Sequence, residues 1–208
     1  MNVDELLARP GLAPRVRVLV AVATSVWRGD WAGLALWART ARDRGQSRQD
    51  LEEILLQAIL FCGFPRVVTA FEQLGEAWPA PVAPTGGSLP PGERTAASRE
   101  LFAAVYGDND KAVRAMLRGY HEELHDFVLD AAYGRILSRP ALDAATREIV
   151  AAGLLAAQDQ VRQFVGHARG ALRLGATKEQ LREALVTALG GGADGDGGDV
   201  DGWFSRLR

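Results

Sequence analysis

The chain has 208 residues, of which 48% are hydrophobic and 24% are charged, as in an ordinary globular protein. A net charge of −2 argues against nucleic-acid binding, and the N-terminus, MNVDELLARPGL, lacks the pattern of a signal peptide. The single cysteine excludes an intrachain disulfide and favours a reducing compartment. No apolar run approaches the roughly 20 residues that span a bilayer. We therefore expect a cytoplasmic protein with no nucleic-acid or membrane partner.

The first half, residues 1–78, has the apolar periodicity of helices. We expect four of them, over about 14–27, 31–44, 47–63 and 66–78. Capping residues precede the second and third helices, and a glycine and a proline separate the third from the fourth. This half is predicted to be a helical repeat.

Residues 79–93, PAPVAPTGGSLPPGE, form a proline-rich linker without apolar periodicity. The second repeat, residues 94–189, begins with helices expected at about 95–106 and 111–133. Residues 190–208 begin with glycine and aspartate and have little to bury, so a loose tail is predicted. That tail replaces the last helix of the first repeat, and β-branched alternation is absent throughout. The fold is predicted to be all-α.

The second repeat is organised around residues 147–183. An apolar helix begins at Arg147 and ends at a polar elbow, residues 158–160, before a helix that contains His167. Gly175 then ends that helix, and a threonine caps a third one. We expect three consecutive packed helices.

Residues 17–53 have the same plan at a constant offset of 130 residues. Such a match in cap glycine, capping hydroxyl and terminal glutamate favours a duplicated helical-hairpin unit. The matching pairs are Arg17 and Arg147, Arg39 and Arg169, Gly45 and Gly175, Ser47 and Thr177, Leu51 and Leu181, and Glu53 and Glu183.

These motifs resemble the carboxymuconolactone decarboxylase family, which includes alkylhydroperoxidase D. The resemblance covers most of residues 17–189 as diffuse motifs and implies the alkylhydroperoxidase D-like fold, assembled as a homo-oligomer, either a trimer or a hexamer. The residues on which it rests are Glu53, Gly63, Pro65, Tyr133, Gly134, Leu142, Arg147, Glu148, His167, Gly175, Ala176, Thr177 and Glu183.

The resemblance also bears on redox chemistry. Peroxidases of this family use a glutamate, a Cys-x-x-Cys pair and a histidine, and the matching glutamate and histidine here are Glu148 and His167. The two cysteine positions are occupied by Gln160 and Gln163. Because the thiolate is the nucleophile of that reaction, thiol peroxidase activity is not expected.

The remaining Glu148–His167 pair has two interpretations. It can act as an acid–base pair on a small lactone or keto acid, in a lyase or isomerase without a cofactor, as the decarboxylase branch implies. Gln160 and Gln163 would then help to bind the substrate. Alternatively, the pair holds two helices in register in a catalytically silent scaffold or a small-ligand-binding protein. Both interpretations stay open.

Further candidate substrate-binding residues are Glu53, Gln57 and Arg147. Family members often have a histidine at the position of Gln57, whereas glutamine can orient a ligand but cannot act as a general base. Arg147 and its counterpart Arg17 can bind a substrate carboxylate, although a structural ion pair within each repeat is the favoured interpretation. Cys62 is expected to be an inert buried thiol.

A possible zinc motif, H-E-x-x-H, lies at His121, Glu122 and His125. The motif is short and lacks the strand framework of the metalloproteases that use it. Two histidines on an exposed helix face are the favoured interpretation, and a zinc hydrolase is the least favoured function. No metal site is predicted.

Overall fold

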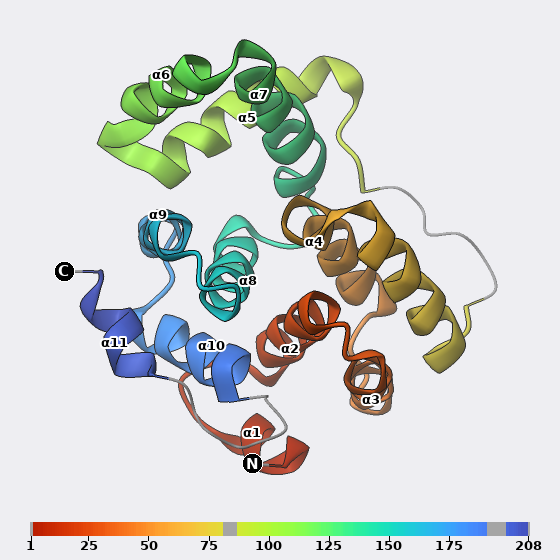
Figure 1. Ribbon diagram of the computed structural model, residues 1–208. Helices are drawn as coiled ribbons and strands as arrows, with labels where there is room; N and C mark the ends of the chain where they lie inside the picture. Colours follow the sequence, from red (N-terminus) through yellow and green to blue (C-terminus); the bar gives the residue numbers. More distant parts are fainter. Residues whose placement is uncertain (1, 81–86, 191–198, 208) are drawn as a thin grey trace.

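The computed structural model describes residues 2–80, 87–190 and 199–207, and these parts are built of helices (Figure 1). Within those ranges there is no strand, so the predicted all-α class is confirmed. In chain order the elements are α1 (Val3–Ala8), α2 (Pro14–Arg28), α3 (Trp31–Asp43), α4 (Arg48–Ala77), α5 (Pro91–Tyr106), the 3₁₀ turn η1 (Gly107–Asn109), α6 (Asp110–Tyr120), α7 (Glu122–Phe127), the π-helix η2 (Val128–Leu137), α8 (Ala144–Ala157), α9 (Val161–Arg173), α10 (Lys178–Gly190) and α11 (Val200–Ser205).

The predicted helix starts are built by side-chain caps. Asp30, Ser47 and Thr177 each accept a hydrogen bond from a backbone N–H in the first turn of α3, α4 and α10. Gly63 has φ 75° and ψ 165°, which interrupts α4 at the predicted place. The segment after Gly63 continues as helix to Ala77.

In the described part of the chain, α4 is the one helix whose length and composition would allow it to cross a membrane. This is weak support for a membrane span, because core helices of soluble proteins pass the same test. The helix is also bent at Gly63 and packs against α2 and α3.

Two sets of three helices surround one core. The set α2, α3 and α4 and the set α8, α9 and α10 follow one another at the 130-residue offset. Helices α2 and α8 pack against each other, and each also reaches the third helix of the other set, α10 and α4 respectively (Figure 1). Apolar side chains of both sets fill a common core.

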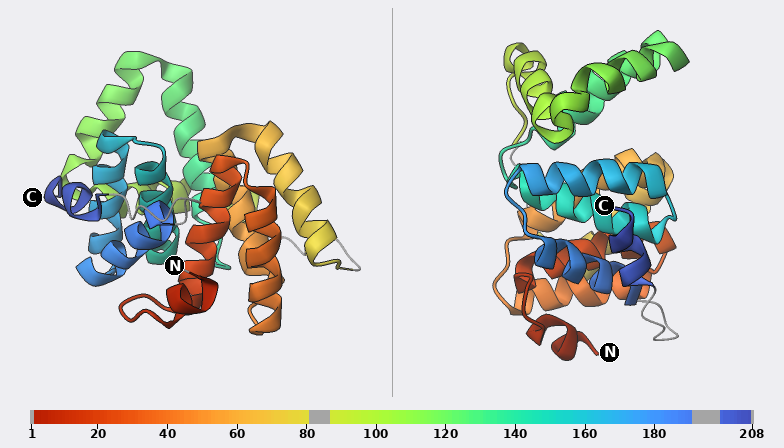
Figure 2. Two further views of the ribbon diagram at one scale, coloured as in Figure 1. Left: turned by 60° about the horizontal axis from the view of Figure 1, so that its bottom comes forward. Right: turned by 90° about the vertical axis from the view of Figure 1, so that its left-hand side faces the viewer.

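The helices that follow α4 and precede α8 in the chain form a separate layer. Elements α5 to η2 have a small core of their own, formed by Phe102, Val105, Tyr133 and Leu137. Figure 2 shows this layer standing out from the body of the molecule. The predicted second half, residues 94–189, therefore holds this layer as well as α8 to α10. The helical stretch expected over 111–133 is divided into α6, α7 and η2.

The C-terminal segment differs from its prediction. Residues 191–198, most of the predicted glycine and aspartate tail, lie outside the described residues. The part that follows is ordered as α11, so the predicted loose tail is wrong for it. Its Trp203 is buried and makes an edge contact with Phe164, with 4.9 Å between ring centroids. One large aromatic side chain gives this short segment apolar area to bury.

The two fully buried arginines, Arg17 and Arg147, lie in two matching clusters. In one, Glu53 accepts hydrogen bonds from Arg139 and Arg147, with N–O distances of 2.7 Å to each guanidinium. Gln57 donates to the carbonyl of Arg147 at 2.9 Å. Burial raises the pKa of Glu53, but the two guanidinium groups outweigh it and leave that pKa below its ordinary value.

The second cluster repeats the first at the 130-residue offset. Glu183 accepts from Arg9 and Arg17 at 2.6 Å, and Arg17 also donates to the hydroxyl of Thr187. Hydrogen bonds from Arg9 and Arg17 hold the pKa of Glu183 below its ordinary value against the opposing effect of burial.

These contacts correct the predicted ion pairs. Arg17 and Arg147 were expected to pair within their own repeats, but each binds the glutamate of the other set. The reason is geometric. Helices α2 and α8 pack side by side, so the N-terminal turn of each faces the third helix of its neighbour.

We expect Glu53→Gln to destabilise the fold by about 3–5 kcal/mol, because it leaves the buried Arg147 guanidinium uncompensated. Urea unfolding at pH 7 measures this change. In the wild type, the contribution of Glu53 is present above the unfolded-state pKa near 4.5 and is lost as pH falls through the lower folded-state pKa.

Asp201→Asn is the matched control, since it removes one carboxylate from an exposed pair with Arg182. Its unfolding midpoint should equal that of the wild type. Equal midpoints for Glu53→Gln and the control would contradict a structural role for the buried cluster.

Candidate functional site

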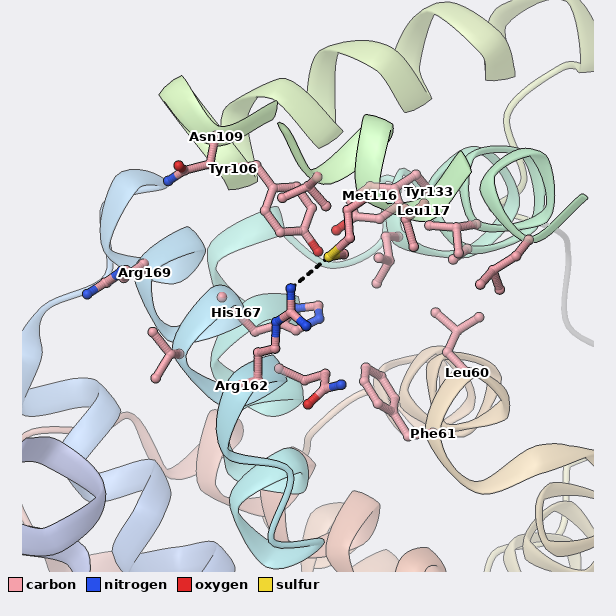
Figure 3. A pocket seen from close by; sticks show the side chains of 18 of the residues that line it. Leu60, Phe61, Tyr106, Asn109, Met116, Leu117, Tyr133, Arg162, His167 and Arg169 are labelled. Carbon is pink, nitrogen blue, oxygen red and sulfur yellow. Dashed lines mark hydrogen bonds between the residues drawn. The ribbon is translucent and has the colours of Figure 1, made fainter. Parts of the chain in front are cut away.

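A cavity of about 720 Å³ lies between α9, the end of the first segment of α4, and the layer formed by α5 to η2 (Figure 3). Its walls are mainly apolar, and its volume is in the range that encloses small-molecule ligands. The apolar lining includes Leu60, Phe61, Val113, Met116, Leu117, Val128 and Leu137.

The ionisable pair of this cavity comes from α8 and α9. His167 lines the cavity, and its Nδ1 lies 2.8 Å from Oε2 of Glu148. The histidine side chain is 14% exposed and the glutamate side chain 2%. Phe61 makes an edge contact with the imidazole at 6.0 Å between ring centroids. With Nδ1 held by the carboxylate, Nε2 is the nitrogen available to a ligand.

The environment changes the proton affinity of His167. Burial alone would lower its pKa, but the charge and hydrogen bond of Glu148 outweigh burial and raise the pKa above its ordinary value of 6.5. The carboxylate of Glu148 therefore favours the protonated imidazole.

Two tyrosines from the extra layer complete the wall opposite His167. Tyr106 ends α5 and Tyr133 lies on η2 (Figure 3). Burial raises the pKa of both phenols, and the negative charge of Glu148 raises both further, so both stay protonated at neutral pH. The hydroxyl of Tyr133 is buried beside the phenol of Tyr106, and the interaction between them raises the pKa of Tyr133 and lowers that of Tyr106.

The π-helix explains how η2 reaches the cavity. Hydrogen bonds from i to i+5 widen each turn, so residues four or five apart share a face. Val128, Ala132, Tyr133 and Leu137 have this spacing, and all four line the cavity. If this segment were an α-helix, the same four side chains would be divided between two faces of the helix.

Polar side chains of α9 form one side of the cavity. Arg162, Gln163, Arg169 and Arg173 all contribute to the lining. The Nη2 atom of Arg162 lies 2.7 Å from the sulfur of Met116 (Figure 3). This side is cationic, whereas the remaining lining is mainly apolar.

The structure separates the predicted site residues into two groups. Glu148, His167 and Gln163 lie together at the cavity. Gln160 is exposed at the start of α9 and does not line the cavity. Its side-chain amide donates a hydrogen bond to the carbonyl of Gln158.

Glu53, Gln57 and Arg147 form the buried ion cluster described above and do not line the cavity. Their partners are one another and Arg139, so their predicted role in substrate binding has no support from the geometry.

Several cavity residues were not foreseen. Met116 and Arg162 lie in ordinary amphipathic helices and Tyr106 at the end of a helix without a marked apolar face, so no sequence signal marks them. Tyr133 is indicated only by the family motif.

The H-E-x-x-H motif does not form a metal site. His121 precedes α7 with an extended backbone and caps it, accepting from the N–H of Glu123. His125 is buried, which corrects the predicted exposed face, and its Nδ1 lies 2.7 Å from Asp126. Among the residues described, no three His, Cys, Asp or Glu side chains are grouped to hold a metal.

Cys62 is half-buried beside the end of the first α4 segment and is not part of the cavity lining. Burial raises the pKa of its thiol to about 11, against a small lowering by Arg66. The thiol is therefore protonated at neutral pH. This agrees with the predicted inert cysteine.

Comparison with known proteins places this arrangement in a family. The sequence profile described as "Carboxymuconolactone decarboxylase family" matches residues 1–76 and 122–192, which together make up more than half of the chain. The chain belongs to this family. The profile covers both sets of three helices and the Glu148–His167 pair, and it omits residues 77–121.

A curated relative is Peroxisomal protein 2 of Schizosaccharomyces pombe. It is 28% identical to this carboxymuconolactone decarboxylase family member over 145 residues, which cover 67% of each chain.

Gly170 brings the extra layer onto α9. A Cβ atom there would lie 2.7 Å from Cγ1 of Val105 and 3.0 Å from Oε2 of Glu148. Gly170→Ala should destabilise the fold by about 1–3 kcal/mol through this overpacking. Gly75→Ala is the control, because nothing lies within 4 Å of its Cβ and the helix should gain about 0.5–1 kcal/mol. Thermal unfolding of both variants measures the difference. Opposite signs are expected, and stabilisation by Gly170→Ala would contradict the close packing.

The pKa of His167 is expected above 6.5 in an NMR pH titration, and Glu148→Gln should lower it by removing the adjacent charge. Because the folded-state pKa is raised, the pair's contribution to stability is complete below pH 6.5 and is lost as pH rises through the folded-state pKa. Glu122→Gln removes an exposed carboxylate as a control and should leave the titration unchanged. A His167 midpoint that is identical in the wild type and Glu148→Gln would disprove the coupling.

Proposed function

We propose that this carboxymuconolactone decarboxylase family member is a cofactor-independent lyase or isomerase that acts on a carbonyl compound such as a keto acid or a lactone. The observation that supports the proposal is the Glu148–His167 pair, 2.8 Å apart at the wall of a mainly apolar cavity. Acid–base groups with shifted pKa values in a cavity are typical of active sites.

The chemistry requires one proton acceptor near the substrate. Neutral His167 donates its Nδ1–H to Glu148, which leaves the lone pair of Nε2 directed to the ligand. Nε2 removes a proton from the carbon next to the carbonyl, and the electron pair of that C–H bond forms an enolate. Where the substrate has a C=C bond next to that carbon, the enolate is conjugated, and return of the proton from the imidazolium to the far carbon of the conjugated system shifts the double bond and gives isomerisation. The carboxylate of Glu148 stabilises the imidazolium between these two steps.

The same groups serve a decarboxylation. In a substrate whose carboxylate lies β to the carbonyl, as in a 3-oxo acid, the C–C bond to the carboxylate breaks, carbon dioxide leaves, and the electron pair moves to the carbonyl oxygen to give an enolate. The imidazolium of His167 then protonates the carbon. Neither reaction needs a thiolate, which agrees with Gln160 and Gln163 at the positions of the family's cysteines.

A second candidate function is a silent small-ligand-binding protein that assembles as a trimer or hexamer. Phe64 and Val68, one turn apart on α4, are 66% and 56% exposed, which supports association between copies. The name of the fission-yeast relative places that protein in the peroxisome. For this chain we propose a cytoplasmic location, which imaging of a tagged protein would test.

Proton exchange separates the two functions. A panel of 2-oxo acids and lactones is incubated in D₂O, and NMR follows loss of the protons next to the carbonyl. We expect exchange in the wild type and a roughly 10²- to 10⁴-fold lower rate in His167→Gln, the usual contribution of a general base. His121→Gln, which removes an exposed histidine, should exchange at the wild-type rate.

Ligand-induced shifts of His167 without any exchange would favour the binding protein over the enzyme. Equal exchange rates in the wild type and His167→Gln would place the chemistry on other residues.

A further inference from the structure

Part of the cavity wall comes from a segment outside the family match. The profile omits residues 77–121, which contain α5, η1 and α6. Six residues of this segment nevertheless line the cavity: Tyr106, Asn109, Val113, Met116, Leu117 and Tyr120. The Glu148–His167 pair therefore belongs to the matched part, whereas the α6 face of the opposite wall lies outside it.

The wall is firmly attached to α9. Arg173 donates to the carbonyl of Val105 at 2.7 Å, and the absence of a side chain at Gly170 lets α5 approach closely. Within the layer, the guanidinium of Arg114 lies 4.5 Å from the centre of the Phe102 ring. These contacts hold the wall in place before any ligand binds, which reduces the entropy lost on binding.

The wall supplies a line of apolar contacts. Val113, Met116, Leu117 and Tyr120 recur at intervals of three and one residues along α6, so they share one helix face. This face borders a cavity of about 720 Å³, which is far larger than a molecule of three or four carbons needs. An extended apolar group would fill it.

Across the cavity, α9 offers a cation next to the acid–base pair. Arg162 points into the cavity beside His167 (Figure 3). Arg162 donates a hydrogen bond to the thioether of Met116, which is a weak acceptor. Among the residues that the structure describes, no carboxylate forms a salt bridge with Arg162. A guanidinium in this situation favours a carboxylate, which it can bind with two parallel hydrogen bonds.

We infer that the ligand is a medium-chain amphipathic carboxylate, whose carboxylate binds Arg162 and whose hydrocarbon chain lies along α6. This inference rests on the proposed function, because it places the carbons next to the carboxyl group beside Nε2 of His167. The preferred substrates are then longer 2-oxo acids, and residues 77–121 select them by chain length.

Three probes test the two halves of the ligand separately. Octanoate has both the chain and the charge, butanoate has the charge with a short chain, and 1-octanol has the chain alone. Binding is measured by the NMR shift of His167 on titration of the full-length protein. We expect octanoate to bind at least about tenfold more tightly than either other probe, since each buried methylene adds to affinity over butanoate and the bonds of the carboxylate to Arg162 add to affinity over 1-octanol.

Variants assign these preferences to residues. Arg162→Gln should weaken octanoate binding roughly tenfold and leave 1-octanol unchanged, whereas Arg42→Gln, an exposed arginine on α3, should change neither. Leu117→Ala should weaken octanoate and 1-octanol several-fold but not butanoate. Leu36→Ala, an exposed leucine on α3, is its control. Because Arg162 is exposed, its variant provides a test even where a core variant unfolds.

The outcomes distinguish this inference from the proposed function. Equal affinities for octanoate and butanoate, octanoate binding unaffected by Arg162→Gln, or no binding of octanoate would overturn the inference. Short 2-oxo acids could still show exchange that depends on His167, so the proposed function would survive. If octanoate binds as expected but 2-oxooctanoate shows no exchange, the ligand class stands and the proposed catalysis fails.

Discussion

Each half of this protein neutralises an arginine that belongs to the other half. Arg147 at the start of α8 binds Glu53 on α4, and Arg17 at the start of α2 binds Glu183 on α10. Burying an arginine without its glutamate would cost several kcal/mol of folding free energy. The first turns of α2 and α8, which contain these arginines, can therefore be buried only when the other set of helices is present. The two sets and their shared apolar core therefore form one cooperative unit rather than two domains joined by a linker.

This exchange also determines where the acid–base pair lies. Arg147 and Glu148 are neighbours in sequence at the start of α8, and successive residues of a helix point to different sides. With Arg147 fixed to α4, Glu148 is directed to α9 and meets His167 at 2.8 Å. The first set has the same arginine, but Val18 and Trp37 occupy the corresponding positions. The ion pairs are thus common to both sets, and the glutamate–histidine pair occurs in one.

Much of this arrangement could be predicted from the sequence because it depends on local signals. Helical periodicity, the caps Asp30, Ser47 and Thr177, and the break at Gly63 all act within a few residues of the position that they determine. The pairing of Glu148 with His167 followed from the family motif. Other features depend on contacts between distant segments, and no local pattern encodes those. The exchange of ion-pair partners, the burial of Trp203 against Phe164, and the wall provided by α5 and α6 are of this kind.

The single thiol of the chain has a consequence for oxidative conditions. Peroxides react with thiolates, and burial keeps Cys62 in the protonated form with a pKa of about 11. Both cysteine positions of the family's redox relay are glutamine. Peroxide is therefore expected to react with Cys62 only slowly. Met116, whose thioether lines the cavity, is the sulfur there that peroxide can oxidise, so oxidative conditions would change the cavity wall rather than a thiol.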